Sequence, residues 1–109
     1  MSVNKLQLNE LPKSLQRQLE WDVKFIKEFN ETILRLRNLE ARFGDRGRYE
    51  AEWRENNDSI VEKLREATDR INSFLLKAQE KGYQGQDVLD ELSYQEPMPF
   101  SQDSLTYFR

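Results

Sequence analysis

The chain has 109 residues and a formal charge of −3, and 34% of its residues are charged. That length provides for one domain with a usable core, and the mean hydropathy of −0.92 concentrates the apolar residues on narrow stripes. Neither cysteine nor histidine occurs. Their absence excludes disulfide scaffolds, thiolate metal sites and the usual general base near neutral pH. We therefore expect a protein that is not an enzyme and has no metal and no cofactor.

The chain also carries no segment that predicts membrane insertion. No run approaches the roughly 20 apolar residues of a membrane span, and residues 1–10 lack the apolar core of a secretory signal. We therefore expect a cytoplasmic protein.

The first elements in chain order are a short lead-in and a long helix. In the lead-in, over residues 1–10, we expect one of two outcomes. Either Leu6, Leu8 and the following Leu11 pack on the open end of the hairpin, or the segment frays. No proline lies between Pro12 and Pro97, which favours helix over most of the chain. A heptad stripe of apolar residues predicts a helix over residues 14–43, with Gly44 as its left-handed cap. The stripe consists of Leu15, Leu19, Ile26, Phe29, Ile33, Leu36 and Phe43.

A second heptad stripe follows the loop at residues 44–47 and predicts a helix over residues 48–81, ended by Gly82. Its core positions are Trp53, Ile60, Ala67 and Phe74 with, in the alternate register, Asn57, Leu64, Ile71 and Ala78. A capping box formed by Ser59 and Glu62 competes with this prediction, because it would start a new helix at Ile60. Since the heptad phase is unbroken, we expect one continuous helix and an antiparallel coiled-coil hairpin.

The four-residue loop also predicts which residues face each other. Facing positions sum to about 93 and give layers in which large side chains meet small or medium ones. These layers are Leu15–Ala78, Leu19–Phe74, Ile26–Ala67, Phe29–Leu64 and Ile33–Ile60. The same register places polar residues in the seam, with Asp22 opposite Ile71, Leu36 opposite Asn57 and Glu40 opposite Trp53. We expect the polar residues to be partly solvated and to fix the register; alternatively, one of them faces a partner or a buried site.

The C-terminal part is predicted to contain a short third helix and an extended tail. Val88, Leu89 and Leu92 share one face of a helix at about residues 87–94. From residue 96 the chain shows two prolines and no helical period. We therefore expect an all-α hairpin domain over residues 1–95 and a docking tail over residues 96–109.

Surplus apolar residues beside the core positions indicate binding to another protein or to a second copy of the chain. They predict a groove along the flank of the hairpin, which the third helix is too short to cover completely. The partner-binding candidates there are Trp21, Val23, Phe25, Leu34, Val61, Leu75 and Leu76. The acidic, aromatic tail adds Phe100, Tyr107 and Phe108, whose pattern is typical of an extended peptide ligand that docks in cis or in trans. We predict an interaction subunit of the adaptor, chaperone or assembly type.

The alternative function is nucleic-acid association through the basic tip of the hairpin. Residues 35–54 carry six arginines against four carboxylates, including the candidates Arg42, Arg46, Arg48 and Arg54. Tyr49 and Trp53 add aromatic faces for stacking. The net charge of −3 and the pI of about 5.1 argue against this alternative, because phosphate binding normally rests on a strong basic field.

Overall fold

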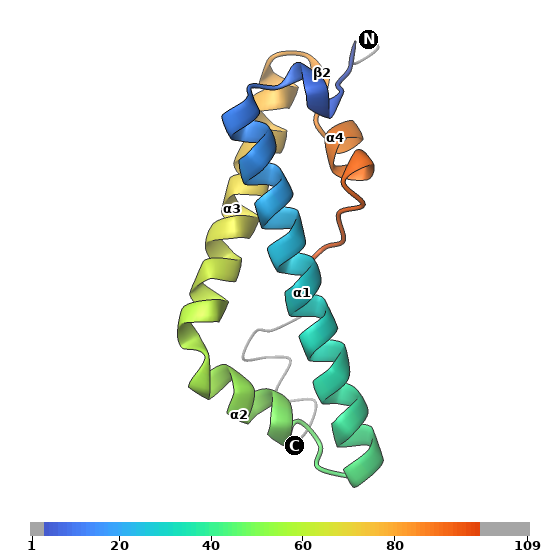
Figure 1. Cartoon of the computed structure of the whole chain (residues 1–109), viewed down its shortest axis with the longest axis vertical. Coiled ribbons are helices and arrows are strands. Elements are labelled where there is room, and N and C mark those ends of the chain that lie inside the picture. The colour runs from blue at the N-terminus through green and yellow to red at the C-terminus, as the bar shows by residue number, and fades with distance from the viewer. Residues whose placement is uncertain (1–3, 99–109) are drawn as a thin grey trace.

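Two antiparallel helical arms give the molecule its elongated shape, about 50 × 28 × 20 Å (Figure 1). The computed structural model describes residues 4–98. The first arm is α1, and the second consists of α2 followed by α3. The elements in order are β1 (Asn4–Lys5), η1 (Leu8–Glu10), α1 (Lys13–Phe43), α2 (Arg48–Asn56), α3 (Asp58–Glu80), β2 (Tyr83–Gln84) and α4 (Gln86–Glu91). The predicted all-α class is confirmed.

Helix α1 begins and ends where its local sequence predicts. Pro12 stands at the N-cap position, since its fixed φ suits a helix start and its missing N–H removes a donor that would have no partner there. Gly44 ends the helix in the left-handed region, with φ of 72°, and its N–H bonds to the carbonyl of Glu40. A residue with a side chain rarely adopts this conformation.

The predicted continuous helix over residues 48–81 is wrong, because the second arm breaks at Asn57 (Figure 1). Asn57 has φ of −131° and ψ of 39°, outside the helical region. Its side-chain amide donates to the carbonyl of Trp53 at 2.7 Å, and its own carbonyl accepts from Ile60 and Val61 to start α3. Asparagine competes with helix formation in this way. The new helix begins at Asp58, two residues before the start that the capping box indicates.

The break changes how α2 packs on α1. Trp53 lies against Phe29, with ring centroids 5.7 Å apart, and not opposite Glu40 as the register predicted. Glu40 instead accepts the N–H of Glu50 at 2.7 Å. Glu50 stands in the first turn of α2, where backbone N–H groups have no intrahelical acceptor. The carboxylate of Glu40 therefore caps α2 from the neighbouring helix, and its charge suits the positive helix end.

A buried ionic cluster completes the contact between α1 and α2. Glu50 is 0% exposed, and its carboxylate bonds to Arg54 at 3.1 Å and to Arg37 at 3.3 Å. Arg54 lies one turn further along α2, whereas Arg37 comes from α1. Because Arg37 and Glu40 both reach Glu50, polar contacts position α2 where the apolar seam is thin.

The opposite end of the hairpin is closed by the lead-in and by α4. Residues Asn4 and Lys5 pair in parallel with Tyr83 and Gln84, an element that sequence patterning did not predict. Leu6 is buried, and its N–H donates to the carboxylate of Asp87 at 3.2 Å. Of the two alternatives for the lead-in, packing on the hairpin end is therefore the correct one.

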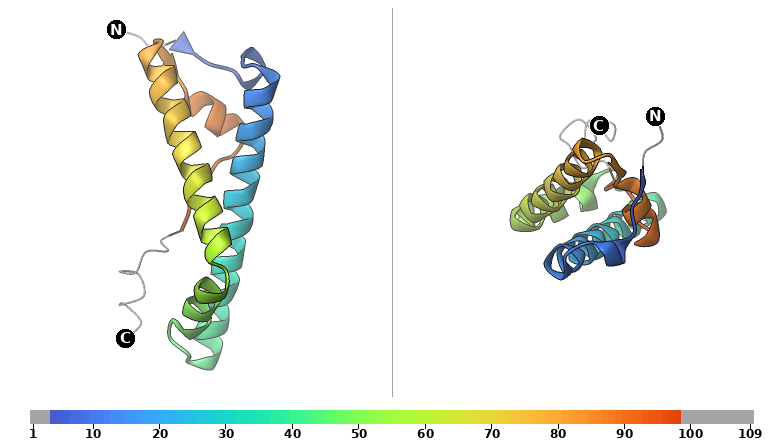
Figure 2. Two further views of the ribbon diagram at one scale, coloured as in Figure 1. Left: turned by 90° about the vertical axis from the view of Figure 1, so that its left-hand side faces the viewer. Right: turned by 90° about the horizontal axis from the view of Figure 1, so that it is seen from above.

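Helix α4 is shorter than predicted, since it ends at Glu91 and not at residue 94. It packs closely on α3 because Gly85 precedes it. A Cβ at Gly85 would lie 3.1 Å from Leu75 and 3.2 Å from Ala78, closer than most side-chain contacts. Figure 2 shows α4 on one side of the plane formed by α1 and α3.

One hydrophobic core runs along the seam between the two arms and under α4. It includes most of the expected heptad positions of both stripes, and it adds Val23, Leu6 and the two α4 residues. The expected core position of Phe43 is wrong, because its side chain is 63% exposed. Its buried members are Leu6, Leu19, Val23, Ile26, Phe29, Ile33, Leu64, Ala67, Ile71, Phe74, Ala78, Val88 and Leu89. The heptad pattern therefore found the seam, while α4 extends the core on one side only.

Candidate functional site

The side of the hairpin away from α4 is uncovered by any other described element, and we call it the open face. Val23 of α1 and Leu75 of α3 mark the covered side, because both pack in the core with α4. Residues two apart on a helix point in nearly opposite directions. Trp21 and Lys77, each two positions from these residues, consequently lie on the open face.

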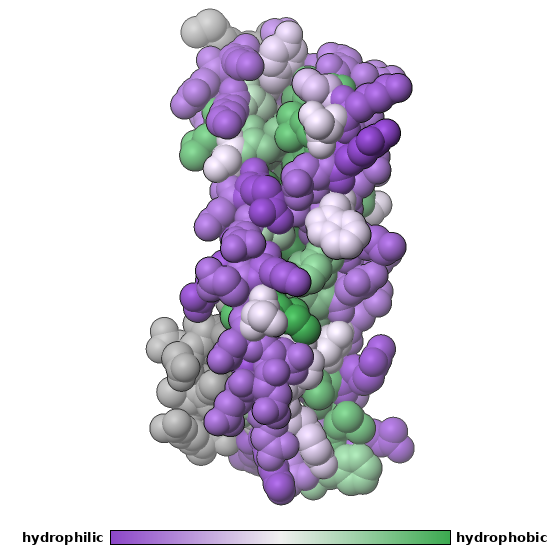
Figure 3. Space-filling view, turned by 60° about the vertical axis from the view of Figure 1, so that its left-hand side comes forward, coloured by the Kyte–Doolittle hydropathy of each residue, from purple (hydrophilic) through white to green (hydrophobic). Residues whose placement is uncertain are grey.

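A row of large apolar residues follows α1 along this face. Its spacings of 4, 11, 3 and 4 residues keep the row on one helix stripe. The row consists of Trp21, Phe25, Leu36, Leu39 and Phe43. Trp21 is 65% exposed and Phe43 63% exposed, whereas the other three are half-buried. Apolar surface recurs along the seam between two polar margins in Figure 3.

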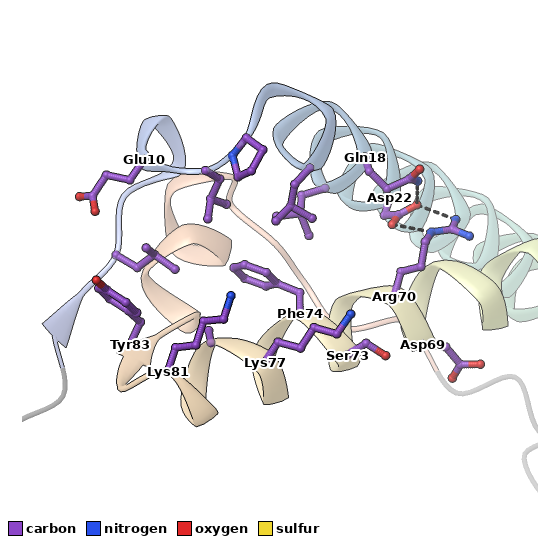
Figure 4. Close-up of a pocket in the computed structure, with 16 residues that line it drawn as sticks. Glu10, Gln18, Asp22, Asp69, Arg70, Ser73, Phe74, Lys77, Lys81 and Tyr83 are labelled. Carbon is purple, nitrogen blue, oxygen red and sulfur yellow. Dashed lines mark hydrogen bonds and ion pairs between the residues drawn. The ribbon is translucent and has the colours of Figure 1, made fainter.

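The open face contains a cleft of about 720 Å³ (Figure 4). The lead-in and the N-terminal part of α1 form one side of it, and the C-terminal half of α3 forms the other. Its apolar surface comes from Leu6, Leu11, Pro12, Leu15, Leu19, Phe74 and Ala78. Its polar margin consists of Glu10, Gln18, Asp22, Asp69, Arg70, Ser73, Lys77, Lys81 and Tyr83. In Figure 4 the side chains of Lys77 and Lys81 extend towards the cleft, whereas Glu10 and Asp69 point away from it.

An ion pair between Asp22 and Arg70 forms the end of the cleft that is farthest from the lead-in (Figure 4). The Asp22 carboxylate, 0% exposed, accepts from Arg70 at 2.8 and 3.0 Å and from Gln18 at 3.0 Å. The bond to Asp22 raises the pKa of the Arg70 guanidinium above its ordinary value. The pair lies one position from the predicted facing residues Asp22 and Ile71. It therefore fixes the register, but the expectation of partial solvation is wrong for Asp22 and also for Glu40, which is buried.

The predicted flank groove is mostly filled by the chain itself. Val23 is buried, and Leu75 and Phe25 are half-buried against the core. Val61 is also half-buried. The predicted groove on the side of Val23 is the side that α4 covers. Val23 is consequently not available to a partner.

The remaining predicted flank residues do not form one patch. Leu34 is 51% exposed and Leu76 is 61% exposed. Leu34 is 13 positions from Trp21, which places it on a different face of α1. Leu76 follows Leu75 and precedes Lys77, so it points away from both the covered side and the open face. The exposed candidate on the open face is therefore Trp21, beside the half-buried Phe25.

The basic tip is less cationic than the sequence indicated. Arg54 is buried in the cluster with Glu50. Arg48 pairs with Glu52 at 3.2 Å, and this bond raises the pKa of its guanidinium. Arg42 and Arg46 are exposed.

The tail candidates Phe100, Tyr107 and Phe108 lie outside the described residues. Before them, the chain is held on α1 by Asn30. Its side chain donates to the carbonyl of Glu96 at 3.0 Å and accepts the N–H of Met98 at 2.8 Å. Residues 96–98 thus contact the hairpin, although the sequence placed them in the tail.

Sequence reasoning missed the cleft and the two lysines at its margin. The signal was present in part, since packing of Leu6, Leu8 and Leu11 on the hairpin end was one of the two alternatives for the lead-in. Lys77 and Lys81 precede Gly82, where positive charges are favourable at the C-terminal end of any helix, so their presence alone does not indicate a cleft. Their four-residue spacing on the side away from Leu75 was the signal that could have located the margin.

The described residues show no group of three acidic side chains that could hold a metal ion. Among the described helices, none has both the length and the apolar character needed to cross a membrane. Comparison of the chain with protein-family models, with curated proteins and with solved structures finds no match.

Proposed function

We propose that this protein is a non-catalytic interaction subunit, of the adaptor, chaperone or assembly type, that binds another protein by helix packing along the open face. The observation that carries the proposal is Trp21, 65% exposed, in an apolar row beside a cleft of about 720 Å³. We place this activity in the cytoplasm, which the absence of cysteine supports.

The energetics of burial support this proposal. Covering a large apolar side chain contributes roughly 1.5–3 kcal/mol, and aromatic residues that enter a partner carry much of the binding energy at interfaces. Trp21 and Phe43 are exposed at opposite ends of one row. A cleft of this size also lies within the range of roughly 300–1,000 Å³ that is typical of binding pockets.

Protein is favoured over nucleic acid as the partner class. The alternative relied on four arginines at the tip, of which Arg54 is buried and Arg48 is paired with Glu52. Phosphate binding requires a concentrated positive field, and the whole chain carries a charge of −3.

Site-specific photo-crosslinking tests the proposal. A photoreactive residue is placed at position 21 in one protein and at position 34 in a matched control, because Leu34 is also exposed but lies on another face. Each is expressed in the cells that produce the protein, and the crosslinked protein is identified and rebound after purification. We expect a defined partner from position 21 and a weaker signal from position 34.

A companion measurement separates binding from folding. Trp21→Ala removes an exposed side chain, so the free energy of unfolding changes by no more than about 0.5 kcal/mol, while binding to the purified partner weakens. Equal crosslinking from both positions, or unchanged binding of the Trp21→Ala protein, would contradict the proposal.

A further inference from the structure

The charges beside the open face differ in sign from the charge of the whole chain. On α1 the exposed basic residues next to the apolar row are Arg17, Lys24 and Arg35, and the acidic ones are Glu28 and Glu31. On the facing margin of α3 the basic residues are Lys63, Lys77 and Lys81, with Glu66 as the acidic one. Arg70 belongs to the same margin but is paired with Asp22. Glu10 and Asp69 also belong to the polar margin of the cleft but point away from it (Figure 4). Counting them, six cations stand against five carboxylates on a chain whose net charge is −3.

These two basic rows lie on opposite sides of an apolar floor. Residues 17, 24 and 35 repeat at spacings of 7 and 11, which keeps them on one stripe of α1. Lys24 also lines a shallow pocket of about 80 Å³ with Trp21 and Phe25, which places it directly beside the apolar row. Lys77 and Lys81 border the cleft on the other side (Figure 4).

We propose that the open face binds an acidic amphipathic helix of a partner protein, and that a bulky apolar side chain of this helix enters the cleft. This inference rests on the proposed function and names the chemistry of the partner. Carboxylates along both edges of the partner helix meet the basic rows, while its apolar stripe covers Trp21 and Phe25. A seam between two helices presents ridges and grooves that suit a third helix better than an extended strand.

The charge pattern disfavours a second copy of the chain on the same face. Packing two open faces together brings basic rows against basic rows, and such like-charge contacts oppose association. An acidic helix meets the same rows with opposite charge. The cleft adds specificity, because its leucines and Phe74 form an apolar surface next to the ammonium groups of Lys77 and Lys81.

Three synthetic helical peptides of roughly 20 residues, about 30 Å long, provide the test with the full-length protein. The first has a leucine stripe, one central phenylalanine and glutamates on both edges. The second replaces every glutamate with lysine, and the third replaces the phenylalanine with alanine. Binding is measured by the fluorescence anisotropy of labelled peptide at low and high salt. We expect the acidic peptide to bind about tenfold more tightly than the basic one at low salt, with the difference shrinking at high salt.

Variants of the protein locate the binding. Lys24→Glu combined with Lys77→Glu should reverse the preference between the acidic and basic peptides, whereas Arg65→Glu, on another face of α3, should not. Ser73→Trp places an indole in the cleft and should remove the advantage of phenylalanine over alanine. Leu76→Trp, which adds the same group outside the cleft, should leave that advantage unchanged.

Three outcomes would overturn the inference. The first is equal affinity for the acidic and basic peptides. The second is a dimer in sedimentation that Lys24→Glu and Lys77→Glu strengthen, which would assign the face to a second copy. The third is displacement of the acidic peptide by anionic phospholipid vesicles at lower concentration than the peptide itself requires. If the peptides fail while crosslinking from position 21 still yields a protein, the stated chemistry is wrong and the proposed function stands; if both fail, both are wrong.

Discussion

The Asp22–Arg70 pair permits a sharp prediction because its two members differ in exposure. The carboxylate is 0% exposed, whereas the Arg70 side chain is 43% exposed. Without Asp22, the guanidinium turns into water. Without Arg70, the buried carboxylate keeps Gln18 as its remaining hydrogen-bond partner among the described contacts. Arg70→Ala should therefore destabilise the protein more than Asp22→Ala does.

The structure sets the expected magnitudes. Arg70 makes two bonds to the carboxylate, at 2.8 and 3.0 Å, and hydrogen bonds to charged groups contribute about 1.5–3 kcal/mol. We expect Arg70→Ala to lower the free energy of unfolding by about 2–3 kcal/mol, and Asp22→Ala by about 1 kcal/mol. The double variant should resemble Asp22→Ala, giving a coupling energy of about 2–3 kcal/mol, equal to the loss for Arg70→Ala.

Urea unfolding of the four proteins, followed by far-UV circular dichroism, measures these differences at neutral pH. Asp22→Leu is an informative addition, because the position lies in an apolar seam and the substitution should cost less than Asp22→Ala or even stabilise. A larger loss for Asp22→Ala than for Arg70→Ala, or the absence of coupling, would refute the reasoning.

Three further predictions follow from named contacts. Glu40→Ala should lower stability by about 1–2 kcal/mol and loosen α2, whereas Glu40→Gln retains an acceptor for the N–H of Glu50 and should cost less; urea unfolding and amide exchange at Glu50 compare the two. A chain ending at Gln95 loses both backbone partners of Asn30, so it should be less stable by about 1–3 kcal/mol than a chain ending at Met98, and equal stability would contradict this role. Burial, and then the charge of Glu96, raise the pKa of Tyr94 above its ordinary value of about 10. Folding favours the neutral phenol, so the contribution of Tyr94 to the free energy of unfolding is complete below about pH 10 and is lost as the pH rises through the raised pKa. Tyr94→Phe should therefore weaken the alkaline destabilisation seen by circular dichroism. An unchanged pH profile would count against this prediction.

Where sequence and structure differ, long-range contacts account for the difference. The Asn57 region contained competing signals, an unbroken heptad phase and a capping box. The break prevails because it allows Trp53 to reach Phe29 and brings Glu50 to Glu40 and Arg37. None of these contacts can be inferred from the spacing of residues along α2 alone.

The sequence likewise predicted one part of the candidate site, and long-range contacts decided the rest. Helical spacing was sufficient to place Trp21 and Phe25 on one face, and surplus apolar residues correctly indicated uncovered surface. Spacing did not show which flank α4 covers. That choice depends on Gly85, which permits close approach to α3, and on Asn30, which holds residues 96–98 against α1. As a result Val23 is buried in the core, while Trp21 is exposed.

The sequence by itself determined the two long helical arms, the loop at Gly44 and the apolar seam, because heptad spacing and helix caps act over a few residues. The tertiary structure alone decided the bend at Asn57, the burial of Arg54 and Asp22, and the side on which the cleft lies. These features depend on pairs such as Asp22 with Arg70, 48 positions apart. A buried charged side chain needs an opposite charge or a hydrogen-bond donor, and for Asp22 and Glu40 folding supplies these from another helix, through Arg70 and the N–H of Glu50.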